Sequence, residues 1–123
     1  MFIFVENLFL MKFFNIKYAI KGIQICLKNE SNFRVHIAGA IIATIAGFNF
    51  NISSTEWMIQ LIGIGLIMSA EAMNTAIEEV VNFISPDWHK QAGIIKDVAS
   101  GAVLLISIFV IICAGIIYWN KIF

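Results

Sequence analysis

Charged residues are scarce in this 123-residue chain, where Lys, Arg, Asp and Glu together make up 13% of the sequence. Soluble domains usually carry about 25% charged and about 45–50% apolar residues, whereas this chain is 60% hydrophobic. Its mean hydropathy is +0.89. These values exclude an ordinary soluble domain and predict a membrane protein. The formal net charge is zero, so the composition indicates no nucleic-acid partner.

Proline, cysteine and phosphate-loop motifs are also rare or missing. The only proline is Pro86, so long helices can form on either side of it. Cys26 and Cys113 form no CxxC pair or zinc spacing, and we expect both to be free thiols. No GxxxxGK[ST] sequence occurs, which excludes a P-loop enzyme. The opening run MFIFVENLFLMKFF has Glu6 before its only lysine and no small-residue cleavage pattern, so we expect mature sequence rather than a signal peptide.

Three largely apolar segments are long enough to cross a membrane. They cover residues 37–55, 57–83 and 97–120. About 20 apolar residues span the hydrocarbon core as a helix. Lipid offers backbone groups no hydrogen-bond partner, so segments of this kind are expected to be helical.

The segment before the first span has a different pattern. Between residues 13 and 33, polar side chains recur at helical spacing on one stripe, and apolar side chains occupy the other faces. The stripe consists of Lys17, Lys21, Gln24 and Lys28. This pattern predicts an amphipathic helix on the membrane surface. We therefore expect residues 1–123 to form one all-α membrane domain with a surface helix and three transmembrane helices.

Basic residues predict how the chain is oriented in the membrane. Seven of the eight Lys and Arg residues precede the first span or lie between the second and third, and only Lys121 follows the third. Because basic residues accumulate in cytoplasmic loops, we expect the N-terminus and the loop around Pro86 to be cytoplasmic.

Polar residues interrupt the cytoplasmic end of the second span. Glu71 and Glu78 are seven residues apart, so both side chains leave the same helix face, which Asn74 flanks. At about 1.5 Å per residue, a span that starts at Trp57 leaves the core about 20 residues later. Glu71 then lies below the boundary and Glu78 just above it. An acid inside the membrane is costly and usually functional, so this geometry predicts chemistry between a lipid and a water-soluble molecule.

Other interpretations of these residues stay open. Glu78 and Glu79 are also typical of the solvated end of a helix, and His36 and His89 are more typical of packing or interface positions than of ligands. Glu71 also suits a small transporter or proton-relay bundle, although that function predicts ionisable residues deep in the other two spans, which have none. A non-catalytic membrane scaffold is the third alternative.

Three segments together resemble the prokaryotic diacylglycerol kinase family, which includes the undecaprenol kinases. They are YAIKGIQICLKNESNFRVH, EAMNTAIEEVV and KDVASGAVLL, in the expected order and spacing over nearly the whole chain. The resemblance implies a homotrimer that uses ATP and Mg²⁺ to phosphorylate the hydroxyl of undecaprenol or diacylglycerol. It also implies the inner (cell) membrane of a bacterium, with a cytoplasmic active site. The sequences FRVH and ASGAVLL favour undecaprenol.

The same resemblance assigns roles to individual residues. Glu71 matches the general base that accepts the proton of the lipid hydroxyl, and Asn74 matches the polar residue beside it. Glu30 and Glu78 match the magnesium ligands. Further matches are nucleotide contacts at Tyr18, Glu30, Glu78, Asp87, Trp88, His89, Lys96 and Asp97, and lipid contacts at Glu71 and Ser100.

The chemistry of these residues agrees with the roles that the resemblance implies. Hard carboxylates suit Mg²⁺, and a lysine such as Lys96 offsets phosphate charge during phosphoryl transfer. Two positions depart from the family pattern. Met11 stands where an arginine is common, and Asn82 stands where an acid is common. We expect the change at Asn82 to weaken nucleotide or metal contacts.

Overall fold

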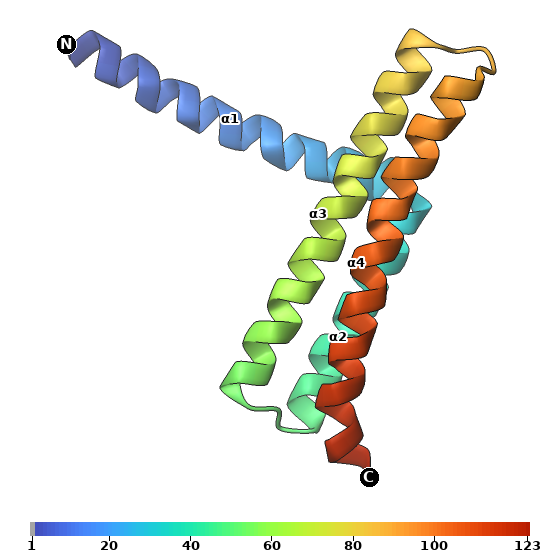
Figure 1. The fold of residues 1–123 in the computed structure, drawn as a ribbon. Coiled ribbons are helices and arrows are strands. Elements are labelled where there is room, and N and C mark those ends of the chain that lie inside the picture. The colour runs from blue at the N-terminus through green and yellow to red at the C-terminus, as the bar shows by residue number, and fades with distance from the viewer. Residues whose placement is uncertain (1) are drawn as a thin grey trace.

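A computed structural model describes the backbone of residues 2–123 and the side chains of all of these except residues 9–14. The regular elements of this part are all α-helices, which confirms the predicted all-α class. They are α1 (Phe2–Asn29), α2 (Ser31–Asn49), α3 (Ser54–Ile84) and α4 (Lys90–Ile122) (Figure 1). The departure at Met11 lies outside the described side chains.

The first helix is longer than predicted and leaves the bundle at a steep angle. The sequence predicted a surface helix over residues 13–33, whereas α1 begins at Phe2 and ends at Asn29. The early start has a simple cause, because no proline or glycine interrupts the N-terminal run. In Figure 1, α1 projects away from the other three helices, which run alongside one another.

A sharp junction at Glu30 separates α1 from α2. The backbone of Glu30 is extended, with φ −114° and ψ 109°, so the helix cannot continue through it. The Arg34 guanidinium then reaches back and donates hydrogen bonds to the carbonyl oxygens of Leu27 and Lys28, both at 2.9 Å. Because the last carbonyls of a helix lack partners within it, Arg34 stabilises the end of α1 and holds α2 against it.

The predicted first span of residues 37–55 was too long at its C-terminal end, because a turn separates α2 from α3 there. Helix α2 ends at Asn49, and Asn51 adopts a left-handed backbone with φ 49°. Ser53 and Glu56 then form a capping box at the start of α3. The Glu56 amide donates to Ser53 Oγ at 3.1 Å, and the Ser53 amide donates to Glu56 Oε1 at 2.9 Å. This reciprocal cap favours helix initiation at Ser54 over continuation of α2.

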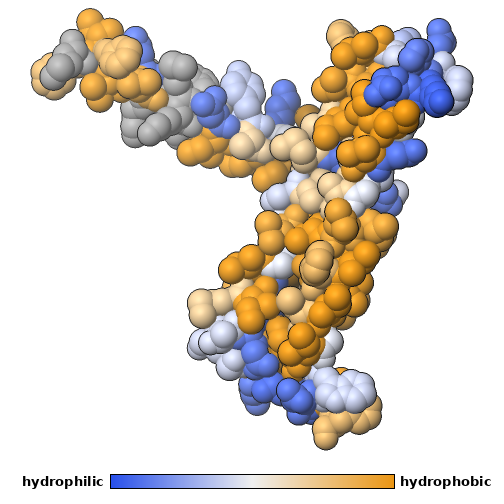
Figure 2. Space-filling model, in the orientation of Figure 1, coloured by the Kyte–Doolittle hydropathy of each residue, from blue (hydrophilic) through white to orange (hydrophobic). Residues whose placement is uncertain are grey.

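The longest interface of the fold joins the antiparallel helices α3 and α4, which lie side by side in Figure 1. The predicted break at Pro86 is confirmed, since residues 85–89 form the loop between them. Among the described residues, these two helices are long and apolar enough to cross a membrane. They correspond to the predicted spans 57–83 and 97–120, with somewhat wider bounds. Figure 2 shows their apolar surface between two hydrophilic ends.

Polar and glycine contacts fix the end of the bundle farthest from the Pro86 loop. The side-chain amide of Gln60 donates to the Ala43 carbonyl oxygen at 2.9 Å, and the Tyr118 hydroxyl donates to Gln60 Oε1 at 2.6 Å. These bonds join α3 to both α2 and α4. Nearby, the ring of Trp57 packs so closely over Gly47 that a Cβ there would lie 2.6 Å from it. The three helices are therefore held in one register.

Candidate active site

The buried face of α3 carries the polar residues that the sequence singled out. Its buried residues include three pairs that are three or four residues apart, and the full set is Gln60, Gly63, Glu71, Asn74, Thr75 and Val81. Glu71 is 3% exposed, which makes it as well buried as Phe33 at 4%. Burying a carboxylate is costly without a partner, so this part of α3 is not explained by packing alone.

Glu71 meets a histidine from a different helix. His36 Nε2, on α2, lies 3.5 Å from Glu71 Oε2, and the side chain of His36 is 26% exposed compared with 4% for Glu71. One turn further along α3, the Thr75 hydroxyl donates to the Glu71 carbonyl oxygen at 3.1 Å. The sequence favoured a packing or interface position for His36, and the structure adds a contact with the Glu71 carboxylate.

Asn74 and Glu78 form a second pair on the same face. The Asn74 side-chain amide donates to Glu78 Oε1 at 3.4 Å, while Asn74 Oδ1 is buried and has no hydrogen-bond partner among the described residues. A buried oxygen without a partner costs about 1–3 kcal/mol, and a bound ligand or cation can satisfy it. The adjacent Glu79 is exposed. The solvated-end interpretation therefore suits Glu79 better than the half-buried Glu78.

Lys96 on α4 is bonded to Asn82, which lies one turn after Glu78 on α3. Lys96 Nζ donates to Asn82 Oδ1 on α3 at 2.6 Å. The amide oxygen at this position thus holds the lysine. Asp97 and Ser100, on the following turn of α4, are both exposed.

The Pro86 loop contains Asp87, Trp88 and His89, for which the sequence predicted nucleotide contacts. The Ser85 hydroxyl donates to the Asp87 carbonyl oxygen at 3.1 Å, and Trp88 is 88% exposed. His89 caps α4, because its Nδ1 accepts a hydrogen bond from the Gln91 amide at 3.1 Å. Part of the His89 ring is therefore committed to a structural role that sequence reasoning missed.

Two further predicted residues lie near the surface helix. Tyr18 is exposed on α1, and Glu30 is half-buried at the α1–α2 junction. Glu30 stands at the N-cap of α2 but makes no side-chain capping bond, so its carboxylate is not committed to the helix end. Among the hydrogen bonds and ion pairs of the described side chains, none joins Tyr18 or Glu30 to Glu71 or Glu78.

The residues present suit a magnesium ion that shares its coordination with a phosphate ligand. In the part of the chain that the structure describes, no three His, Cys, Asp or Glu side chains gather closely enough to form a metal site by themselves. Mg²⁺, however, usually takes only one or two carboxylates and completes its shell with substrate phosphates and water. The Glu78 carboxylate and the unpartnered Asn74 Oδ1 offer oxygen ligands of this kind.

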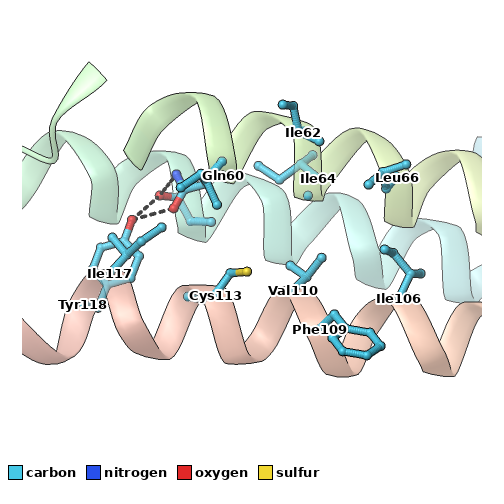
Figure 3. A pocket seen from close by; sticks show the side chains of 14 residues that line it. Gln60, Ile62, Ile64, Leu66, Ile106, Phe109, Val110, Cys113, Ile117 and Tyr118 are labelled. Atoms are coloured by element: carbon cyan, nitrogen blue, oxygen red, sulfur yellow. Dashed lines mark hydrogen bonds between the residues drawn. The ribbon is translucent and has the colours of Figure 1, made fainter. Parts of the chain in front are cut away.

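An apolar cavity of about 350 Å³ lies deeper in the bundle (Figure 3). Helices α2, α3 and α4 line it, and its polar side chains include Gln60 and Tyr118 near one end. On α3 its lining runs from Ile59 to Leu66, and Leu66 lies five residues before Glu71, which corresponds to about 7.5 Å along the helix. The cavity therefore extends along α3 toward the polar site.

Comparison with known proteins places this arrangement in a family. The family described as prokaryotic diacylglycerol kinase matches residues 17–118. An undecaprenol kinase of Bacillus subtilis is 38% identical over 104 residues, which cover 85% of each chain. Diacylglycerol kinases of Haemophilus influenzae and Escherichia coli are 30% and 29% identical, covering 86% and 84% of each chain. The chain therefore belongs to the prokaryotic diacylglycerol kinase family, whose members are membrane-bound lipid kinases.

Proposed function

We propose that this lipid kinase transfers the γ-phosphoryl group of ATP to the hydroxyl of undecaprenol at the cytoplasmic face of a bacterial inner (cell) membrane. The observation that carries the proposal is the burial of Glu71 on the same α3 face as Asn74 and Glu78. A buried carboxylate is suited to a lipid hydroxyl. The half-buried Glu78, two turns closer to the Pro86 loop, is suited to a water-soluble nucleotide.

Phosphoryl transfer then needs few groups from the protein. Glu71 accepts the proton of the lipid hydroxyl while the hydroxyl oxygen attacks the γ-phosphorus, and the bond to the bridging β,γ oxygen breaks to release ADP. Lys96, held by Asn82, offsets phosphate charge. Glu30 and Glu78 would hold a magnesium ion, which when bound neutralises charge on the phosphate oxygens. Asn74 fixes the Glu78 carboxylate.

The Pro86 loop and α1 supply the remaining nucleotide contacts in this proposal. Trp88 is an exposed aromatic side chain in the loop, and Tyr18 is exposed on α1, so both rings are free to pack against a base. Asp87, His89 and Asp97 complete this set. Ser100, which is exposed on α4, contacts the lipid near its hydroxyl.

The choice of undecaprenol rests on similarity and on the apolar cavity. The Bacillus subtilis undecaprenol kinase shares more identity with this chain than do the two diacylglycerol kinases described above. The cavity, whose lining on α3 reaches Leu66, offers space for a hydrocarbon chain on the helix that carries Glu71.

We extend the proposal to topology and assembly. Helix α2 lies alongside α3 in the bundle (Figure 1). We propose that α2 is a third transmembrane helix beside α3 and α4, and that α1 lies on the membrane surface. The working unit in this proposal is a homotrimer. If Glu30 and Glu78 of one site come from different chains, mixing the impaired Glu30→Gln and Glu78→Gln chains will give more activity than either variant alone, whereas sites within one chain will give no gain.

The proposed function is tested by incubating purified protein with Mg-ATP and either undecaprenol or diacylglycerol in mixed micelles. Phosphate transfer is expected to both lipids or to undecaprenol alone, with the higher kcat/KM for undecaprenol. A higher value for diacylglycerol would overturn the choice of lipid. No transfer to either lipid by folded protein would overturn the function.

A further inference from the structure

His36 stands out because it is the described basic side chain that reaches the buried carboxylate of Glu71. Its Nε2 lies 3.5 Å from Glu71 Oε2. The other ion pair of the described side chains, between Lys121 and Glu56 at 3.4 Å, belongs to the opposite end of the bundle. Within the described part of the chain, His36 is therefore the one cationic or titratable partner of this carboxylate.

A general base works only when its carboxylate is held in one orientation toward the reacting hydroxyl. Bases in enzyme sites are commonly oriented by a third group, and their hydrogen bonds are often long without substrate and tighten in the complex. A separation of 3.5 Å needs only a small side-chain movement to become a hydrogen bond. His36 meets these conditions from α2, across the interface between α2 and α3.

The geometry points to His36 as a positioning residue for Glu71 in the proposed lipid kinase reaction. Its Nε2–H donates to Oε2 and fixes the carboxylate, which leaves Oε1 to accept the proton of the lipid hydroxyl. This role rests on the proposed function, because it assumes that Glu71 is the base. His36 itself does not touch the phosphoryl group in this account.

The position of His36 also connects two parts of the site. Arg34, one half-turn earlier on α2, is bonded to the last carbonyls of α1. The first turns of α2 therefore hold the α1–α2 junction, which carries Glu30, and contact Glu71 through His36. A change at His36 alters the orientation of Glu71 without touching the junction.

Three substitutions separate the positioning role from simple packing. In His36→Gln, the amide nitrogen takes nearly the place of imidazole Nε2, whereas His36→Asn puts its nitrogen closer to the backbone and His36→Leu has no donor. We expect Leu and Asn to lower kcat about tenfold to a hundredfold, which is part of the ~10²–10⁴ that a general base supplies. We expect Gln to stay within about threefold of wild type, with KM for ATP unchanged in all three.

The controls distinguish this inference from the proposed function. Wild-type transfer to undecaprenol and its loss in Glu71→Gln establish the reaction, and Val35→Leu, at the exposed neighbour of His36, should match wild type. His36→Leu placed in Glu71→Gln should lower kcat no further, since the two residues act as a unit. Equal kcat in the Gln, Asn and Leu variants, or additive losses in the double variant, would overturn the positioning role. If His36→Leu fails to fold, the kcat values of His36→Gln and His36→Asn test the positioning role by themselves.

Discussion

Lys96 on α4 donates a hydrogen bond of 2.6 Å to Asn82 on α3, close to the ends of the two helices that meet at the Pro86 loop. This contact fixes a cation beside the α3 face that carries Glu78. An amide oxygen accepts a hydrogen bond from lysine as a carboxylate does, so Asn82 can hold Lys96 in this position.

Substitutions at Lys96 and Asn82 should separate the effect of the lysine charge from the effect of holding that charge in place. Lys96→Met is expected to lower kcat about a hundredfold or more, as is typical when a preorganised group at a developing charge is removed. Asn82→Ala keeps the charge but loses about 1 kcal/mol of hydrogen bonding, so KM for ATP should rise about fivefold. Steady-state kinetics will measure both, with Lys90→Met as the control for loss of a charge on α4. A Lys90→Met defect as large as that of Lys96→Met would contradict a specific role for Lys96.

Asn74 should matter for activity more than for stability. Its Oδ1 is buried without a partner among the described residues, so Asn74→Leu removes a desolvation cost together with one long hydrogen bond to Glu78. We expect kcat to fall about a hundredfold while the unfolding midpoint in detergent stays level or rises. Activity assays and thermal unfolding of the same sample will check this. A large loss of stability would show that Asn74 is mainly structural.

Neighbouring acids on α3 provide a matched test of the metal proposal. Chelation of Mg²⁺ should abolish transfer, and Glu78→Gln should raise the Mg²⁺ concentration needed for half-maximal rate at least about tenfold. Glu79→Gln removes the same charge from an exposed position and should leave that concentration unchanged. Titration of activity with Mg²⁺ measures both. Equal shifts in the two variants would point to general electrostatics instead of a ligand.

Two glycines on α2 test the packing between α2 and α3. A Cβ at Gly47 would lie 2.6 Å and 2.7 Å from atoms of the Trp57 ring, whereas nothing lies within 4 Å of a Cβ at Gly39. Gly47→Ala is expected to cost about 1–3 kcal/mol through overpacking. Gly39→Ala should be neutral or stabilise by up to about 1 kcal/mol, since alanine is the better helix former. Thermal unfolding in detergent compares them, and equal midpoints would contradict the tight Gly47–Trp57 contact.

The helices were largely predictable, because long apolar runs and a single proline leave few alternatives in a membrane. The residues at which the helices begin and end were harder to predict. The predicted span 37–55 ran through the turn after Asn49, although the residues carried a signal: Asn51 suits a left-handed backbone, and Ser53 with Glu56 has the spacing of a capping box. The start of α1 at Phe2 was missed because polar periodicity identified only its second half.

The candidate site was predictable where its residues lie on one helix. Fixed periodicity places Glu71, Asn74 and Glu78 on one face of α3, whatever the tertiary structure. Contacts between helices depend on packing, and the sequence has no short-range signal for them. His36 beside Glu71 and Asn82 beside Lys96 are of this kind.

The most direct measurement is transfer of labelled γ-phosphate from ATP to undecaprenol by the wild-type protein and by Glu71→Gln. The substitution keeps the size of the buried side chain but removes its ability to accept a proton. We predict that kcat falls by about 10²–10⁴, with KM for ATP and the unfolding midpoint nearly unchanged. Glu71→Gln protein that phosphorylates undecaprenol at the wild-type rate would contradict this prediction.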